Sequence, residues 1–127
     1  MNRIKHVAIC AKDQEKVAQF YEKVMGLKRV ERAEEEGGMG GSRSIFLTDG
    51  YIALAIVPAG KEAERDVWLD HIGFIVEDGQ GMYEQLKQED VAVYADAPKP
   101  FYKVRALKGV DMDIATANRG WPGIAAD

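Results

Sequence analysis

Hydrophobic and polar positions change period early in the chain. Residues 4–11, IKHVAICA, form a short run rich in β-forming side chains, and a helical pattern follows from Asp13. Asp13 stands where an N-cap carboxylate accepts backbone hydrogens, and Gly26 stands where a helix commonly ends. The pattern predicts a strand followed by a helix with one buried face: Val17, Phe20, Tyr21 and Val24.

The same pattern returns in the second half of the chain. Residues 69–87, LDHIGFIVEDGQGMYEQLK, align without a gap on residues 4–22, IKHVAICAKDQEKVAQFYE. In this alignment His71 falls on His6 and Asp78 falls on Asp13. The only two histidines of the chain therefore occupy one position of a duplicated unit.

Strand-like segments follow each predicted helix. In the first copy, Asp49-Gly50 is a hairpin signal between two such segments. The organisation is β-α-β-β-β twice, which predicts an α+β fold in a single domain of residues 1–127, with modules of about 1–60 and 67–127. The predicted strands are LKRVERA, SRSIFLT and YIALAIV in the first copy, and VAVYA, FYKVRAL and VDMDIAT in the second.

Both histidines are predicted to lie on the sheet face that points away from the helices. Alternation along a strand groups Ile4, His6, Ala8 and Cys10 in the first copy, and Leu69, His71, Gly73 and Ile75 in the second. The small residues Ala8 and Gly73 leave space beside each imidazole. Pseudo-symmetric pairing of the modules would point both rings into one cup.

A divalent metal normally takes a carboxylate in addition to two imidazoles. The strand GVDMDIATA carries acidic residues in an otherwise apolar run, which is costly unless they are paired or metal-bound. We predict Asp113 as the third ligand, with Asp111 as the alternative nearer the turn. Matching this strand to GYIALAIVP places Asp113 opposite Leu54.

Composition and charge favour a protein that acts on a small molecule. The chain has 127 residues, a net charge of −4 and scattered basic residues, which argues against a nucleic-acid surface. No apolar run is long enough to span a membrane, no secretory signal opens the chain, and the one cysteine cannot form an internal disulfide. We expect a cytoplasmic protein that binds a small molecule, with no nucleic-acid or membrane partner, and that forms a homodimer.

Three segments resemble the vicinal oxygen chelate superfamily, which includes glyoxalase I, extradiol dioxygenases, methylmalonyl-CoA epimerase and bleomycin-resistance proteins. They are IKHVAI with DQEKVAQFYEKVMGL, LDHIGFIVED, and ALKGVDMDIAT. The resemblance implies paired modules around a curved mixed sheet, with His6 and His71 as metal ligands. It places Asp113 where the family usually has Glu, while the turn Leu107-Lys108-Gly109 lacks the family's Asp and Pro.

The resemblance also separates activities within the superfamily. Glyoxalase I and the epimerase take a further Glu or Gln ligand from the strand where this chain has Leu54. An open site with two histidines and one carboxylate is similar to that of the extradiol dioxygenases, which favours Fe(II) or Mn, with Zn, Ni or Co possible. The alternatives are a metal-free sequestration protein of the bleomycin-resistance kind and a non-redox lyase or isomerase.

Other residues are candidates for roles around the cup. Tyr102 is predicted to donate a proton or a hydrogen bond, or else to lie at the rim. Arg43 and Arg105 are candidates for anchoring an anionic group, and Cys10 is interpreted as a wall residue. The GGMGG run is expected to form a lid or hairpin, and Trp121 to pack at the sheet edge or cover the cup.

Overall fold

The computed structural model describes residues 1–31, 43–89, 91–93, 101–105, 110–116, 121 and 124. Its elements follow the predicted order of strand, helix and three strands, twice. The first half holds β1 (Arg3–Ala11), α1 (Gln14–Val24), β2 (Lys28–Arg29), β3 (Ile45–Thr48) and β4 (Ala53–Pro58). The second half holds β5 (Val67–Val76), α2 (Gly79–Lys87), β6 (Ala92–Val93), β7 (Phe101–Arg105) and β8 (Asp111–Thr116).

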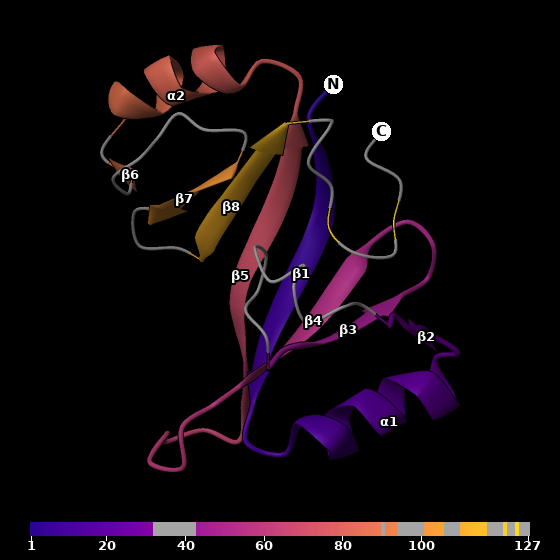
Figure 1. The fold of residues 1–127 in the computed structure, drawn as a ribbon. Coiled ribbons are helices and arrows are strands. Elements are labelled where there is room, and N and C mark those ends of the chain that lie inside the picture. The colour runs from indigo at the N-terminus through magenta and orange to yellow at the C-terminus, as the bar shows by residue number, and fades with distance from the viewer. Residues whose placement is uncertain are drawn as a thin grey trace.

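The strands form one eight-stranded sheet in the order β2-β3-β4-β1-β5-β8-β7-β6. The two first strands of the modules, β1 and β5, lie antiparallel at its centre. On either side a parallel neighbour follows, β4 beside β1 and β8 beside β5, so that the two halves repeat the same arrangement. The fold class predicted from the duplication, an α+β protein with a curved mixed sheet, is confirmed (Figure 1).

Capping interactions place both helices as predicted. The side chain of Asp13 accepts from the backbone N–H of Lys16, and that of Asp78 accepts from the N–H of Gly81. Gly26 follows the end of α1 with φ 73°, a conformation that favours glycine. The two helices lie toward opposite ends of the sheet (Figure 1).

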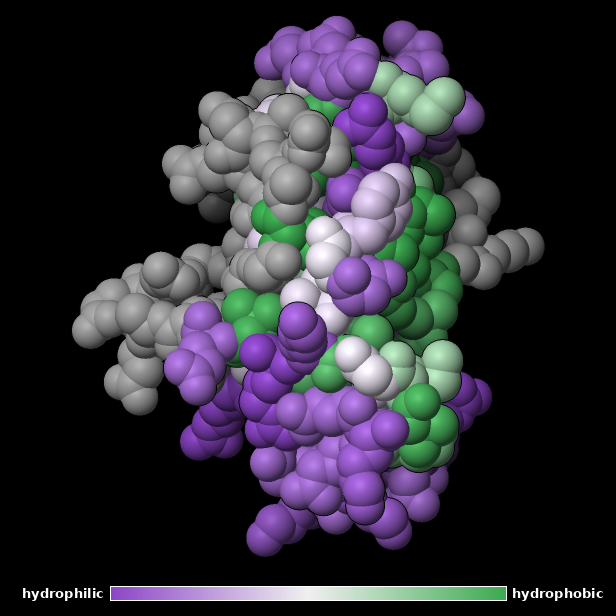
Figure 2. All heavy atoms as spheres, turned by 90° about the vertical axis from the view of Figure 1, so that its right-hand side faces the viewer, coloured by the Kyte–Doolittle hydropathy of each residue, from purple (hydrophilic) through white to green (hydrophobic). Residues whose placement is uncertain are grey.

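The predicted buried face of α1 is partly wrong. Val17 and Tyr21 pack against the buried cluster of Ala11, Ala18, Leu47 and Ile56, but Phe20 and Val24 are exposed. The helix is rotated so that Ala18, rather than Phe20, faces the sheet. Seen from the side, hydrophobic residues gather along one edge of the molecule, while its two ends are mostly hydrophilic (Figure 2).

Irregular register at the centre of the sheet changes which residues share a face. Ala8 lies opposite His71 and Ile9 lies opposite Leu69, which leaves Asp70 as an extra residue in β5. Leu69 therefore shares the face of Ile9, and its predicted place beside His71 is wrong. A second shift separates Ile4 from His6, and Ile4 pairs with Phe74 instead.

The hairpin between β3 and β4 forms at the predicted position. Gly50 has φ 97°, and the Asp49 carboxylate accepts from the backbone N–H groups of Tyr51 and Ile52. These hydrogen bonds lower the pKa of Asp49. Among the residues that the structure describes, no helix is both long enough and apolar enough to cross a membrane.

Candidate metal centre

Three buried side chains converge on the open side of the two central strands. His6 comes from β1, His71 from β5 and Asp113 from β8, and their ligand atoms all lie within 4.8 Å of one another. Nε2 of His71 lies 3.1 Å from Nε2 of His6 and 3.1 Å from Oδ2 of Asp113. The structure thus brings together all three residues of the predicted ligand set within one chain.

Strand pairing explains why these three residues meet. His6 lies opposite Gly73, and Gly73 lies beside Asp113 in the parallel pair of β5 and β8. Residues directly opposite in a sheet share a face, so one glycine separates the first histidine from the carboxylate. Asp111 lies beside His71 in register, but its side chain is half exposed and points to Arg105, 4.0 Å away.

Second partners fix the orientation of both imidazole rings. Nδ1 of His6 lies 3.0 Å from the carbonyl of Ala53, and Nδ1 of His71 lies 2.7 Å from Oδ2 of Asp70. Both partners are acceptors, so each Nδ1 carries the hydrogen and donates it. In a neutral ring this leaves a lone pair on Nε2, and both lone pairs point into the same space as the Asp113 carboxylate.

The bulge in β5 supplies one of these partners. Because Asp70 is the extra residue, its carboxylate lies beside His71 rather than on the other face of the strand. Burial, with a smaller contribution from the neighbouring Asp70, raises the pKa of Cys10 to about 11. Cys10 is therefore a protonated thiol in the wall, as its predicted role requires.

The two histidines titrate in opposite directions. Burial and the neighbouring His71 lower the pKa of His6 to about 4. Burial would also lower the pKa of His71, but its contacts with Asp113 and Asp70 outweigh this effect and raise it. Asp113 is buried as well, yet His71 and Lys103 stabilise its charge and lower its pKa.

This donor set fits a divalent cation. Two ligand atoms that lie about 2.1 Å from a metal, at right angles to each other, are about 3 Å apart. This is the spacing between His6 and His71 and between His71 and Asp113. Three lone pairs within 4.8 Å of one another, two pairs of them at 3.1 Å, repel unless a proton or a cation lies between them. A proton on His71 relieves this repulsion, in keeping with the raised pKa of this residue. A bound metal ion would relieve it in the same way.

Lys103 is a site residue that sequence reasoning missed. Its Nζ lies 2.8 Å from Oδ1 of Asp113, the oxygen that does not face His71. Lys103 lies opposite Asp113 in the antiparallel pair of β7 and β8, so both share the open face. The residue could have been found by applying the same pairing to FYKVRAL and VDMDIAT.

The predicted counterpart of Asp113 in the first copy is wrong by one residue. His6 lies beside Ala53 and Ala8 beside Ala55, just as His71 lies beside Asp111 and Gly73 beside Asp113. The counterpart of Asp113 is therefore Ala55, and Leu54 packs on the helix-covered face. A one-residue slip moves a side chain to the other face, but the conclusion that β4 supplies no ligand holds for Ala55 too.

Aromatic residues close the His6 side of the cup. The ring of Trp121 stacks on His6, with ring centroids 4.8 Å apart and planes 16° apart, and Trp121 is only 2% exposed. Phe46 also stacks on His6, at 6.2 Å, and Phe101 meets the Trp121 ring edge-on. Of the two predicted positions for Trp121, the structure shows the one that covers the cup.

The structure does not place Tyr102 at the site. Tyr102 lies opposite Ile114 and packs with Val76 and Val104 against α2, on the face opposite to Asp113. Its hydroxyl donates to the carbonyl of Gly79, and burial raises its pKa to about 12. The predicted catalytic role of Tyr102 is corrected on this ground, because alternation along β7 gives the open face to Lys103.

The remaining candidates lie apart from the cluster of His6, His71 and Asp113. Arg43 is exposed, and its backbone carbonyl accepts from Gln14. Arg105 is exposed near Asp111 at the far end of β7. The GGMGG segment and the turn Leu107-Lys108-Gly109 fall outside the described residues.

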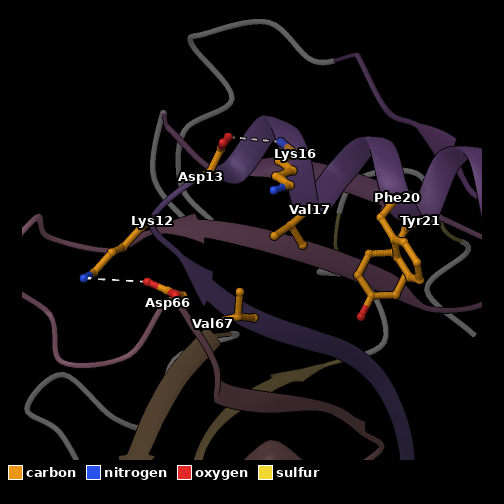
Figure 3. A pocket seen from close by; sticks show the side chains of 8 residues that line it. All are labelled: Lys12, Asp13, Lys16, Val17, Phe20, Tyr21, Asp66 and Val67. Carbon is orange, nitrogen blue, oxygen red and sulfur yellow. Dashed lines mark hydrogen bonds and ion pairs between the residues drawn. The ribbon is translucent and has the colours of Figure 1, made fainter.

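A separate groove lies on the helix-covered face, between α1 and the start of β5 (Figure 3). Its volume is about 530 Å³, and it is lined by Val17 and Phe20 from α1 and by Val67 from β5. Both of its carboxylates are engaged, since Asp13 caps α1 and Asp66 lies 3.8 Å from the Lys12 ammonium. No histidine lines this groove, so the candidate metal ligands are those of the cup.

The fold and this site define a class of protein with two paired modules and a cup-shaped sheet. The chain matches the family model of the Glyoxalase/Bleomycin resistance protein/Dioxygenase superfamily over residues 3–107, and it belongs to that superfamily. The superfamily expected from the sequence is therefore confirmed. A search of curated protein sequences found no match.

Solved structures show the same fold at low sequence identity. A hypothetical protein from Bacillus halodurans C-125 is 20% identical, with a TM-score of 0.64 and coverage of 91% of this chain and 94% of that chain. Methylmalonyl-CoA epimerase from Mycobacterium tuberculosis is 14% identical, with a TM-score of 0.64 and coverage of 89% and 86%. The 2,3-dioxygenase LapB from Pseudomonas sp. KL28 is 15% identical, with a TM-score of 0.63 and coverage of 90% and 40%.

Proposed function

We propose that the protein is a metal-dependent enzyme of this superfamily that acts on a small molecule with two neighbouring oxygen atoms. The observation that carries the proposal is the convergence of two oriented imidazole lone pairs and one buried carboxylate. His6, His71 and Asp113 would hold the metal, with Fe(II) or Mn(II) favoured over Zn, Ni or Co. A divalent ion in such a site supplies Lewis acidity toward substrate oxygens, or a redox centre for O₂.

The protein's own groups have separable tasks in this proposal. The carbonyl of Ala53 and the carboxylate of Asp70 hold the two rings with Nε2 directed inward. Trp121 and Phe46 keep water from the His6 ring, which is 1% exposed. Among the described residues, three side chains converge as ligands, which would leave positions for two substrate oxygens and favours a dioxygenase-like site over that of glyoxalase I.

Two alternatives remain beside the dioxygenase. A non-redox lyase or isomerase would use the same three ligands, and the epimerase among the structural neighbours favours keeping it. A metal-free sequestration protein would have no use for two imidazoles held with their lone pairs facing each other. The ligand geometry therefore argues against sequestration more strongly than against the lyase.

Metal analysis of protein purified without chelators tests the proposal. We expect close to one divalent ion per chain after reconstitution with Fe(II) under anaerobic conditions or with Mn(II). Oxygen uptake with a catechol panel would then identify a dioxygenase, and deuterium exchange next to a substrate carbonyl would identify an isomerase. Protein that binds no stoichiometric divalent metal would rule out the enzyme proposal.

We also propose that the protein forms a homodimer. Val67 and Leu69, on the helix side of the central strand β5, are each 47% exposed. On α1, Phe20 is 53% exposed and Val24 is 64% exposed. Exposed apolar side chains next to one another favour burial against a second copy. Light scattering after size exclusion is expected to give the mass of two chains, and a mass of 14.1 kDa would contradict the dimer.

A further inference from the structure

A small cavity opens beside His71 and Asp113, and neither His6 nor Trp121 lines it. Its volume is about 130 Å³, which is roughly that of four molecules of liquid water. It is lined by Asp70, His71, Lys103, Asp111, Met112 and Asp113. Two of the three ligands thus face a space that a small molecule could enter.

The acidic residues of this cavity already have cationic or donor partners. Asp70 accepts from His71, Asp113 faces both His71 and Lys103, and Asp111 lies 4.0 Å from Arg105. Asp70 and Asp113 are therefore not free to bind a substrate cation, and the charge of the half-exposed Asp111 is screened by solvent and by Arg105. The lining therefore does not select for a positively charged ligand.

Lys103 is placed differently from these acids. An ammonium has three N–H donors, and the carboxylate of Asp113 accepts from Lys103 through one oxygen at 2.8 Å. The Lys103 side chain is 52% exposed and lines the cavity next to the ligand carboxylate. It is the one lysine or arginine that lines this cavity among the described residues.

We propose that Lys103 binds an anionic oxygen of the substrate, so that the substrate is a small organic anion with vicinal oxygens. The inference rests on the proposed metal site and adds the charge and size of its substrate. Two oxygens would bind at the metal, and a further carboxylate or enolate oxygen would accept from the Lys103 ammonium. The 130 Å³ cavity limits this substrate to a few non-hydrogen atoms near the metal.

Oxalate and its monoamide, oxamate, are suitable probes, because both carry vicinal oxygens and oxalate has one more negative charge. We would titrate each into manganese-loaded protein by calorimetry. Lys103→Met is expected to weaken oxalate binding about 10- to 100-fold, as loss of a charged hydrogen bond does, and to weaken oxamate binding much less. Lys103→Arg keeps the charge and is expected to keep most of the oxalate affinity.

Lys87→Met is the matched control, because it removes the same charge from α2 on the other face, where Lys87 lies 3.3 Å from Glu84. It is expected to leave both affinities unchanged. Equal weakening of oxalate and oxamate by Lys103→Met would show that Lys103 only supports Asp113, and would overturn the inference. Unchanged oxalate affinity in a metal-loaded Lys103→Met protein would overturn it as well.

Failure of the metal site itself would look different. Wild-type protein that does not bind manganese would overturn the proposed function and this inference together. Manganese binding with an intact oxalate affinity in Lys103→Met would overturn the inference alone. Because Lys103 is half exposed, its replacement is expected to leave the fold intact, and circular dichroism would check this.

Discussion

His71→Ala is expected to weaken divalent-metal binding by at least about 100-fold. Loss of a residue that only orients a ligand already costs about 10- to 100-fold in metal affinity, and His71 is at the centre of the site. Its Nε2 lies 3.1 Å from both other ligands, so the replacement also leaves Asp113 without its histidine partner. Calorimetric titration with Mn(II) and metal analysis after dialysis would measure the loss.

Asp111→Ala is the control variant, because Asp111 is the nearby carboxylate that we do not assign as a ligand. Asp111 is two residues from Asp113 on the same strand, lines the same cavity and carries the same charge, but its side chain is half exposed. Its replacement is expected to change the metal affinity by no more than about threefold, as for a weak, screened surface charge. If Asp111→Ala and His71→Ala weakened binding equally, the assignment of the three ligands would be wrong.

The metal affinity should also rise with pH in the wild-type protein. The contacts of His71 with Asp113 and Asp70 outweigh burial and raise its pKa above 6.5, so a proton competes with the metal below that raised value. The affinity is expected to fall about tenfold for each unit that the pH drops below it. His6 adds no competition in this range, because burial and the neighbouring His71 keep its pKa near 4.

The same shifts set the pH dependence of the metal-free fold. The raised pKa of His71 stabilises the fold fully below about pH 6.5, and this contribution is lost as the pH rises through the folded-state value. His6 acts in the opposite sense, since its lowered pKa costs stability as the pH falls from about 6.5 toward 4. Urea denaturation of chelator-treated protein across pH 4 to 9 would separate the two effects.

The duplication made the fold and the convergence of the three proposed ligands predictable from the sequence. An ungapped alignment of the two copies places His6 on His71, and equivalent positions of paired modules meet near the pseudo-symmetry axis of the sheet. The acidic residues in β8 were recognisable because a charge in an apolar strand needs a partner. Local patterns of this kind survive folding because strand alternation and helix caps depend on neighbouring residues.

The errors all concern which face a side chain occupies. The extra residue at Asp70 reverses the alternation in β5, so Leu69 faces the helices while Asp70 reaches His71. Comparing Asp113 with Leu54 rather than Ala55 was a slip of one residue between the copies. Register between strands depends on contacts across the sheet, which a single strand's sequence does not contain.

Gly73→Ala is the second change with a large expected effect. A Cβ at this position would lie 2.6 Å from Cζ2 of Trp121 and 2.8 Å from Cβ of His6, closer than real side chains approach. The Trp121 ring must therefore move, and the strand pair of His6 and Gly73 must adjust as well to relieve the contact with Cβ of His6. We expect the change to lower the free energy of unfolding by about 1–3 kcal/mol and to displace Trp121 from His6.

Fluorescence separates this local displacement from a general loss of stability. The chain has two tryptophans, so a Trp68→Phe background isolates the emission of Trp121, which should shift to longer wavelength when the ring leaves its buried position. Gly60→Ala is the matched control, because a Cβ there meets nothing within 4 Å. Its free energy of unfolding and its emission are expected to stay close to those of the wild type.

A double-mutant cycle of Gly73→Ala and Trp121→Ala measures the contact between these two positions. Trp121→Ala alone is expected to cost about 3–5 kcal/mol, because it removes a buried aromatic ring that packs on His6 and Phe101. Once the ring is gone, only the 2.8 Å approach to Cβ of His6 is left, so Gly73→Ala should cost less in the Trp121→Ala background than in the wild type, and the two changes should be non-additive. Additive costs, or equal behaviour of Gly73→Ala and Gly60→Ala, would show that Trp121 does not fill the cup in solution.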